Sequence, residues 1–352
     1  DVWQESHLRS FTDGAVTTTR LITTRRDDIV PPQASRIVVD AMTASEAVAI
    51  LAWGLAGVGS TPRPALERLA SERLGEWPIL LSLVNGFLRS RVERGEPLEQ
   101  AIIQVSERMD RRGLVAFDRT LDDERTAAVE KTVGVGLQML AEFDQSGRPA
   151  GFHAARYGEL AVFPEDVEVP IATIMRLWER LGAVDRVGAE ELLERLYGLA
   201  LLQALDLKRR TVRLHDVMRK YLCDLLQGMA LKELHARMVD AFDSVNGEDL
   251  SDAEERRYFF GYLPTHLAEA GQRDVVDALL VDPQWMQRKL RTVGLQGLMS
   301  DYEAYARQEG AEFVRRTLDL TGRIVARDMR QLLPQLVGRL AANDDANIAT
   351  LL

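Results

Sequence analysis

The sequence predicts a mostly helical protein made of several domains. Long stretches of the 352-residue chain carry apolar residues every three or four positions, which is the spacing of an amphipathic helix. Segments rich in β-branched residues are few and short. A chain of this length is too long for one ordinary core, so we expect two to four domains.

The composition excludes several classes of protein. Hydrophobic residues make up 46% of the chain, which is enough for sizeable cores, while the net charge of −10 argues against a nonspecific grip on nucleic acid or an anionic membrane. The single cysteine, Cys223, allows neither a disulfide framework nor a cysteine-based zinc site, and it fits a reducing cytoplasm. The longest uncharged run, Ala47–Pro62, is too short to span a bilayer, and no signal peptide is visible.

The first part of the chain, residues 1–58, has the pattern of an α/β domain. Val16–Thr24 and Arg36–Val39 are the expected strands, and a helix with Thr43 or Ser45 as its N-cap is expected to follow them. The first strand would end on hydroxyls and the guanidinium of Arg25. Strand ends face the ligand crevice of an open α/β sheet, so these groups suit a phosphate.

Residues 59–120 predict a small helical bundle. Three segments keep their apolar residues on one face, and these are Pro64–Leu74, Pro78–Arg91 and Leu98–Met109. Pro78 stands at the first turn of its helix, where the missing N–H of proline costs nothing.

Residues 121–225 have the order of a winged helix. A long helix over about Asp122–Asp144 is followed by a helix that ends near Trp178, a turn, a helix over Ala189–Leu199, and a hairpin over 201–214. The helix that would enter a DNA groove carries Glu190, Glu191 and Glu194. Acidic side chains on that face would repel phosphates, so we do not expect this unit to bind DNA.

Residues 226–352 read as paired helices. The segment Arg257–Gly271 followed by Asp274–Leu280 is typical of a helical hairpin with a glycine turn. No strict period of 20 to 50 residues occurs, which argues against a regular solenoid.

Five segments, in this order, resemble the NB-ARC (STAND) family of signalling nucleotide switches, the ATPase module of apoptotic protease-activating factors and plant resistance proteins. The segments are Asp1–Trp3, Leu21–Arg26, Gly75–Leu81, Leu160–Asp166 and Leu214–Leu222. The resemblance implies that residues 1–58 are the end of a P-loop nucleotide-binding α/β domain, with the P-loop itself upstream of Asp1. It further implies a helical domain over 59–120, a winged helix over 121–225, and over 226–352 a helical arm that precedes an absent WD-repeat propeller.

The resemblance also implies roles for single residues. Asp1 matches the second acid of a Mg²⁺-linked pair, and Arg25, next to Thr24, matches the arginine that senses the terminal phosphate. Pro78 would pack on adenine, although Glu76 and Trp77 depart from the family motif. Each match also has a plain structural interpretation, such as a chain terminus, a solvated arginine or a first-turn proline.

His215 and Asp216 carry the most specific match. Leu214–Asp216 stands where the family has Met-His-Asp, so the resemblance makes His215 the ligand of the ADP β-phosphate and Asp216 its support. The plain interpretation is a pair that caps the following helix.

The function implied by the resemblance is a cytoplasmic ADP/ATP switch that uses Mg²⁺. It would be locked by ADP at rest, form homo-oligomers when activated, receive input from the WD-repeat part and signal through an N-terminal effector. Hydrolysis would be slow, and the present stretch alone would be inactive without a P-loop. Two alternatives stay open: a scaffold that no longer exchanges nucleotide, and a transcriptional regulator of the same superfamily.

Overall fold

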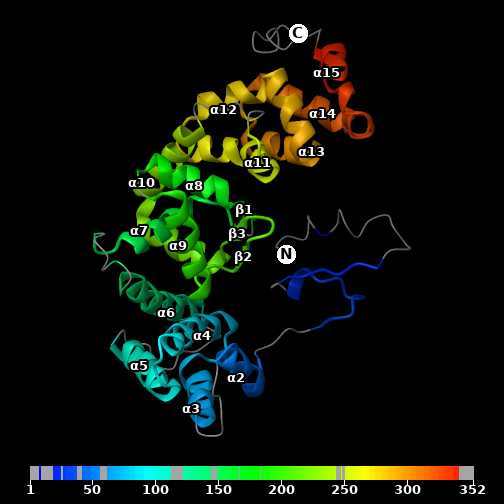
Figure 1. The fold of residues 1–352 in the computed structure, drawn as a ribbon. Helices are drawn as coiled ribbons and strands as arrows, with labels where there is room; N and C mark the ends of the chain where they lie inside the picture. Colours follow the sequence, from blue (N-terminus) through cyan, green and yellow to red (C-terminus); the bar gives the residue numbers. More distant parts are fainter. Residues whose placement is uncertain are drawn as a thin grey trace. The chain divides into compact units, whose positions relative to one another are not determined.

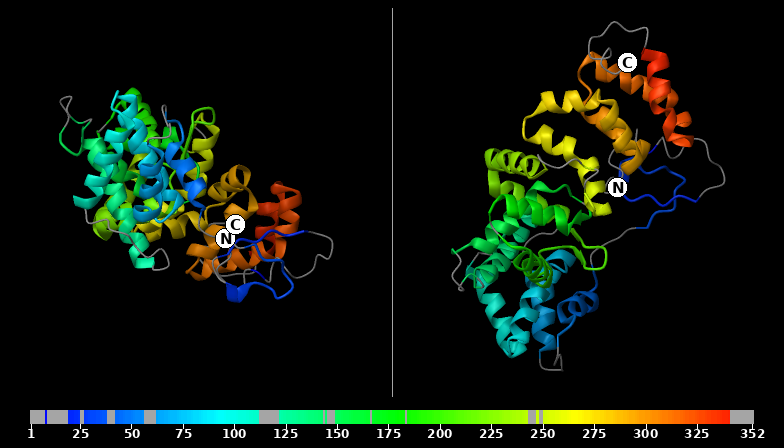
Figure 2. Two further views of the ribbon diagram at one scale, coloured as in Figure 1. Left: turned by 90° about the horizontal axis from the view of Figure 1, so that it is seen from below. Right: turned by 45° about the horizontal axis from the view of Figure 1, so that its top comes forward.

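The computed structural model describes residues 8, 19–24, 27–37, 42–55, 62–111, 122–142, 144, 149–165, 167–182, 184–242, 247 and 250–340. The chain divides into two compact units, Asp1–Ala41 and Met42–Leu352. Figures 1 and 2 show the ribbon. The described part is mostly helical, as the sequence predicts.

The first unit corrects one expectation. Residues 19–24 and 36–37 form no strand, and Asp27–Ile29 form a 3₁₀ turn, η1; residues 16–18 and 38–39 of the expected strands lie outside the described residues. Leu21, which a buried strand would cover, is 90% exposed. A strand is stable only when neighbouring strands take up its backbone hydrogen bonds, and the described residues of this unit supply no neighbour.

The second unit begins with a helical bundle. Three of its helical segments lie where the sequence predicts them, whereas the helix expected to close the α/β part of residues 1–58 packs into the same bundle as its first helix. Thr43 caps the first helix as expected, since its side chain accepts the N–H of Glu46 while the Glu46 carboxylate accepts the N–H of Thr43. The bundle consists of α2 (Ala44–Ala52), α3 (Arg63–Arg68), a π-helical turn η2 (Leu69–Arg73), α4 (Pro78–Glu93) and α5 (Leu98–Arg111). Helix α4 packs on both α2 and α5 and is the centre of the bundle.

The middle of the unit combines helices with a small antiparallel sheet of strand order β1-β3-β2. Its elements are α6 (Asp122–Glu142), α7 (Phe152–Glu159), η3 (Leu160–Val162), β1 (Val169–Pro170), α8 (Ile171–Arg180), α9 (Arg186–Gly198), β2 (Ala204–Asp206) and β3 (Thr211–Arg213). The expected hairpin is β2 with β3. Strand β1 was not expected, and it pairs Val169 with Val212.

The remaining elements are helices that pack in sequence order. They are α10 (Asp216–Phe242), α11 (Ala253–Glu269), α12 (Arg273–Leu280), α13 (Pro283–Tyr305), α14 (Glu309–Arg327), η5 (Met329–Gln331) and α15 (Leu332–Leu340). The expected hairpin of α11 and α12 turns at Gly271, whose φ of 82° is the left-handed conformation that glycine adopts freely. Helix α13 is kinked at Gly294, where φ is 79° and ψ is 179°.

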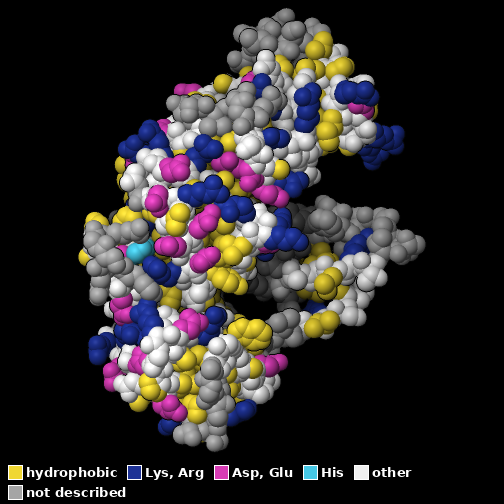
Figure 3. Space-filling model, in the orientation of Figure 1, with side chains coloured by type: hydrophobic (Ala, Val, Ile, Leu, Met, Phe, Trp, Pro, Cys, Tyr) yellow, Lys and Arg dark blue, Asp and Glu magenta, His cyan; other side chains and the backbone are white. Residues whose placement is uncertain are grey.

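Buried side chains form two hydrophobic clusters within the second unit. The larger reaches from α2 to Trp285 of α13 and includes Trp178 and Tyr157, whereas the smaller joins α11 to α15 around Tyr302. Charged groups of both signs are interspersed on the face seen in Figure 3. Among the described residues, no helix is both long enough and apolar enough to cross a bilayer.

Candidate functional site

A cavity of about 510 Å³ in the second unit brings together two of the residues singled out in the sequence. Pro78 of α4 and His215, which directly precedes α10, both line it. The other walls come from the end of α2 and from the turn between α9 and β2. These segments are far apart in the sequence, so the cavity is a product of tertiary packing.

Pro78 occupies the first position of α4, as its sequence context predicts. Trp77 stands before it in an extended conformation with φ of −90° and ψ of 120°, the backbone geometry that a following proline favours. The Pro78 ring is exposed at the mouth of the cavity, with Ile79 and Ser82 beside it. It offers a flat apolar surface on which a planar ring could pack.

His215 is held by the first turn of α10. Its Nδ1 lies 3.2 Å from the Val217 nitrogen and also contacts the Asp216 carboxylate. It accepts the Val217 N–H in one tautomer and donates its own proton to Asp216 in the other. Asp216 Oδ1 also accepts the Val217 N–H, at 2.7 Å. The opposite nitrogen, Nε2, has no hydrogen-bond partner among the described residues, so it is the nitrogen left for a ligand.

Two helices begin at this cavity. Helix α4 starts at Pro78, and α10 starts one residue after His215. The first backbone N–H groups of a helix have no partner within it and give its N-terminus a partial positive charge. Two such ends on one cavity, together with an imidazole, favour an anion such as a phosphate group.

Two residues of α4 set the shape of the cavity. Gly86 packs against the turn after α9 so closely that a Cβ there would lie 2.6 Å from the backbone carbon of Leu199. Buried Asn85 donates hydrogen bonds to the backbone oxygens of Leu51, at 3.0 Å, and Trp53, at 2.8 Å. Asn85 therefore fixes the end of α2, which leaves the Trp53 side chain at the cavity edge and 74% exposed.

Sequence reasoning missed several lining residues, namely Trp53, Ser82, Arg89, Tyr197 and Gln203. Arg89 adds a cationic side chain, whose Nη2 lies 3.5 Å from Glu93. Ser82 and Arg89 stand four and eleven positions after Pro78 and so share its side of α4, a spacing that could have identified them.

Not all of the predicted site residues fall in this cavity. Asp216 contacts His215 but does not line the cavity, and Thr24 belongs to the first unit. Asp1 and Arg25 lie outside the described residues. The described part of the chain offers no group of three histidine, cysteine or carboxylate side chains that could hold a metal ion.

Comparisons with known proteins agree on one group of relatives. Residues 231–321 match the family model described as the APAF-1 helical domain. The chain is 25% identical over 315 residues to apoptotic protease-activating factor 1 of Danio rerio, which covers 87% of this chain and 23% of that protein. The Homo sapiens protein of that name is 23% identical over 232 residues, covering 65% of this chain and 17% of that protein. The chain thus spans less than a quarter of the length of these curated relatives.

Proposed function

We propose that this chain, a relative of the apoptotic protease-activating factors of the NB-ARC (STAND) type, is part of a nucleotide-dependent signalling switch. The observation that carries the proposal is that Pro78 and His215 line the same cavity, and that two helices begin at its wall. Its volume of about 510 Å³ is in the range of small-molecule sites.

The domain interpretation belongs to the same proposal. Residues 1–58 would complete a P-loop domain, 59–120 form the helical domain, 121–225 a winged helix, and 226–352 the arm. The order of α8, α9, β2 and β3, with β1 closing the sheet, supports the winged helix. The whole protein would lie in the cytoplasm, with an effector before this chain and a WD-repeat sensor after it.

The proposed resting state is held by ADP. Pro78 would pack on the adenine while His215 Nε2 donates a hydrogen bond to the β-phosphate, so the nucleotide would bridge α4 and α10. Asp216 would orient the imidazole and hold the first turn of α10. Exchange for ATP would release this link and allow subunits to assemble, as in a two-state switch biased by ligand contacts.

The test is the nucleotide that the full-length protein carries when it is purified. We expect denaturation to release close to one ADP per chain, and His215→Ala or Asp216→Val to reduce that amount severalfold and raise signalling. A charge-assisted hydrogen bond contributes about 1.5–3 kcal/mol, which corresponds to about a tenfold or larger loss of affinity. Lys220→Ala is the matched control, since Lys220 is exposed on the same helix and does not line the cavity. Equal ADP retention in all variants would contradict the role of His215.

A nucleotide-independent scaffold is the second proposal, favoured by the departures at Glu76 and Trp77 beside Pro78. A folded full-length protein that carries no nucleotide and binds none would support it.

A further inference from the structure

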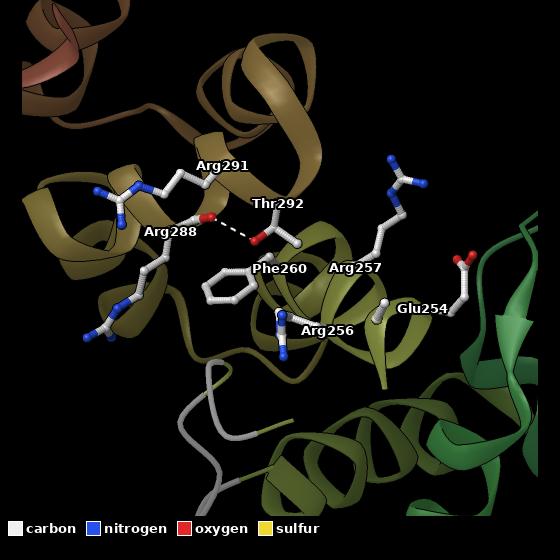
Figure 4. A pocket seen from close by; sticks show the side chains of 8 residues that line it. Glu254, Arg256, Arg257, Phe260, Arg288, Arg291 and Thr292 are labelled. Carbon is white, nitrogen blue, oxygen red and sulfur yellow. Dashed lines mark hydrogen bonds between the residues drawn. The ribbon is translucent and has the colours of Figure 1, made fainter. Parts of the chain in front are cut away.

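A second cavity lies in the helical arm, between the first two turns of α11 and the middle of α13. Its volume is about 560 Å³, and none of the residues that line it lines the first cavity. Four of its lining residues are arginines: Arg256 and Arg257 from α11, and Arg288 and Arg291 from α13. Figure 4 shows these side chains around Phe260.

The charge of the lining is strongly unbalanced. Among the described residues, Glu254 is the only carboxylate that lines the cavity. That carboxylate lies 3.5 Å from Nη2 of Arg209, and Figure 4 shows it turned toward the sheet and away from the other side chains. The described lining therefore carries excess positive charge in a chain whose net charge is −10.

Arg256 and Arg288 are half-buried, whereas Arg257 and Arg291 are exposed. The Nη2 of Arg256 donates to the backbone oxygen of Leu250, and its Nε is buried without a hydrogen-bond acceptor in the described part of the chain. Burial removes water from a guanidinium group. Where hydrogen-bond acceptors of the protein do not fully replace that water, the positive electrostatic potential near the group rises and a bound anion is favoured.

The floor of this cavity is rigid. Phe260 is 1% exposed and packs on Trp285, with 5.1 Å between the ring centroids. Arg288 Nη2 lies 3.4 Å from Gln284 Oε1, and Thr292 Oγ1 donates to the Arg288 backbone oxygen at 2.8 Å. In Figure 4, Arg256 and Arg288 flank the Phe260 ring, Arg291 extends on the Arg288 side, and Arg257 points the opposite way.

We propose that this cavity binds a small phosphorylated anion, with Arg256, Arg288 and Arg291 as its contacts. Guanidinium groups bind phosphate oxygens in a two-pronged geometry, and three of them suit a ligand with more than one phosphate. The volume lies in the range of small-molecule pockets, which favours a small ligand over a protein segment. The ligand would bind across α11 and α13 and stiffen the arm, independently of the nucleotide cavity.

The test is a calorimetric titration of the full-length protein with inorganic pyrophosphate. We expect saturable binding that weakens as the salt concentration rises. Arg256→Gln and Arg291→Gln should each weaken it about tenfold or more, because each removes a charge-assisted hydrogen bond. Arg323→Gln on α14 is the matched control, since Arg323 is exposed and does not line the cavity.

Further variants separate this site from the first cavity. His215→Ala should leave the arginine-dependent pyrophosphate binding intact while it reduces ADP retention. Arg291 is exposed, so Arg291→Gln should keep the fold even if Arg256→Gln destabilises the arm. Pyrophosphate binding that is absent from the unmodified protein, or that Arg291→Gln leaves unchanged, would overturn the proposal.

Discussion

At the scale of single residues, Glu76 holds a backbone conformation that favours glycine. It stands two positions before Pro78 and adopts a φ of 54°, in the left-handed region. This conformation costs a residue with a side chain about 1–2 kcal/mol, whereas glycine adopts it freely but loses more backbone entropy on folding. The loop before Pro78 therefore carries backbone strain at Glu76.

The corresponding prediction is that Glu76→Gly stabilises the protein by about 0.5–1 kcal/mol. Chemical denaturation of the two proteins at neutral pH would measure the change. Gly75 precedes it with a φ of 56°, so Gly75→Ala is the converse control and should destabilise the protein. A loss of stability in Glu76→Gly would mean that side-chain contacts of Glu76 outweigh the backbone strain.

The structural role of a single residue could be predicted where it depends only on neighbouring residues in the sequence. The Thr43 cap and the first-turn position of Pro78 follow from neighbouring residues and are both found. The exposed Trp53 could not be predicted, because its position depends on hydrogen bonds from Asn85, 32 residues later in the chain.

At the scale of elements, the approach of α4 to the turn after α9 positions the walls of the first cavity. Gly86→Ala would place a methyl group 2.6 Å from the Leu199 backbone carbon and 2.9 Å from the Gly198 oxygen. Backbone atoms cannot rotate away as a side chain would, so α4 must shift. We expect a loss of about 1–3 kcal/mol in the free energy of unfolding, together with weaker ADP retention.

Gly228→Ala provides the matched control for this prediction. Gly228 is exposed within α10, and a Cβ there would meet nothing within 4 Å. Alanine is the better helix former, so this variant should gain up to about 1 kcal/mol. If Gly86→Ala were equally stabilising, the close packing of α4 on the turn would be wrong.

Helices could be predicted where the apolar spacing of one segment defines them. Strands could not be predicted where they depend on pairing with another segment. The helices α4, α5 and α9 have clear apolar faces and were found. The two-residue strand β1 has no periodicity of its own and exists because Val169 pairs with Val212 of β3. Residues 19–24 of the strand expected over Val16–Thr24 are not in a strand, and no neighbouring strand is described beside them.

At the scale of the whole molecule, the order of the helical elements followed from the sequence, whereas the meeting of Pro78 with His215 did not. They are 137 positions apart, and only the packing of α4 near the start of α10 brings them to one cavity. A motif resemblance could name both residues, but their proximity is a property of the folded chain.

The junction of α10 and α11, which links the larger cluster to the arm, contains a buried network of two histidines and a tyrosine. His235 Nδ1 lies 3.0 Å from His266 Nδ1, and the Tyr258 hydroxyl lies 2.8 Å from His266 Nε2. Both histidines are more than nine-tenths buried. Burial is the main cause that lowers the pKa of His235 to about 4 and that of His266 to about 3, and the charge of Arg219 lowers both further.

These lowered pKa values predict that acid destabilises the junction. Below about pH 6.5 the unfolded chain takes up protons that the folded histidines resist, so stability falls as the pH drops from 6.5 toward 4. Each histidine contributes a slope of about 1.4 kcal/mol per pH unit in that window. Glu159 and Asp301 act in the opposite direction, because burial raises the pKa of Glu159 to about 7 and that of Asp301 to about 6.

Comparing two proteins isolates the histidine contribution from these carboxyls. The stability of the unmodified chain and of the double variant His235→Gln, His266→Gln would be measured by denaturation between pH 7 and pH 5. As the pH falls, we expect the free energy of unfolding of the variant to rise relative to that of the unmodified protein. The reason is that only the unmodified protein contains the two histidines that resist protonation in the folded state. Histidine NMR provides a second measurement if the variant does not fold, because His266 should remain neutral at pH 5 in the native protein. A His266 ring that titrates near pH 6.5 would show that the junction between α10 and α11 opens to water, and the predicted acid sensitivity would then be wrong.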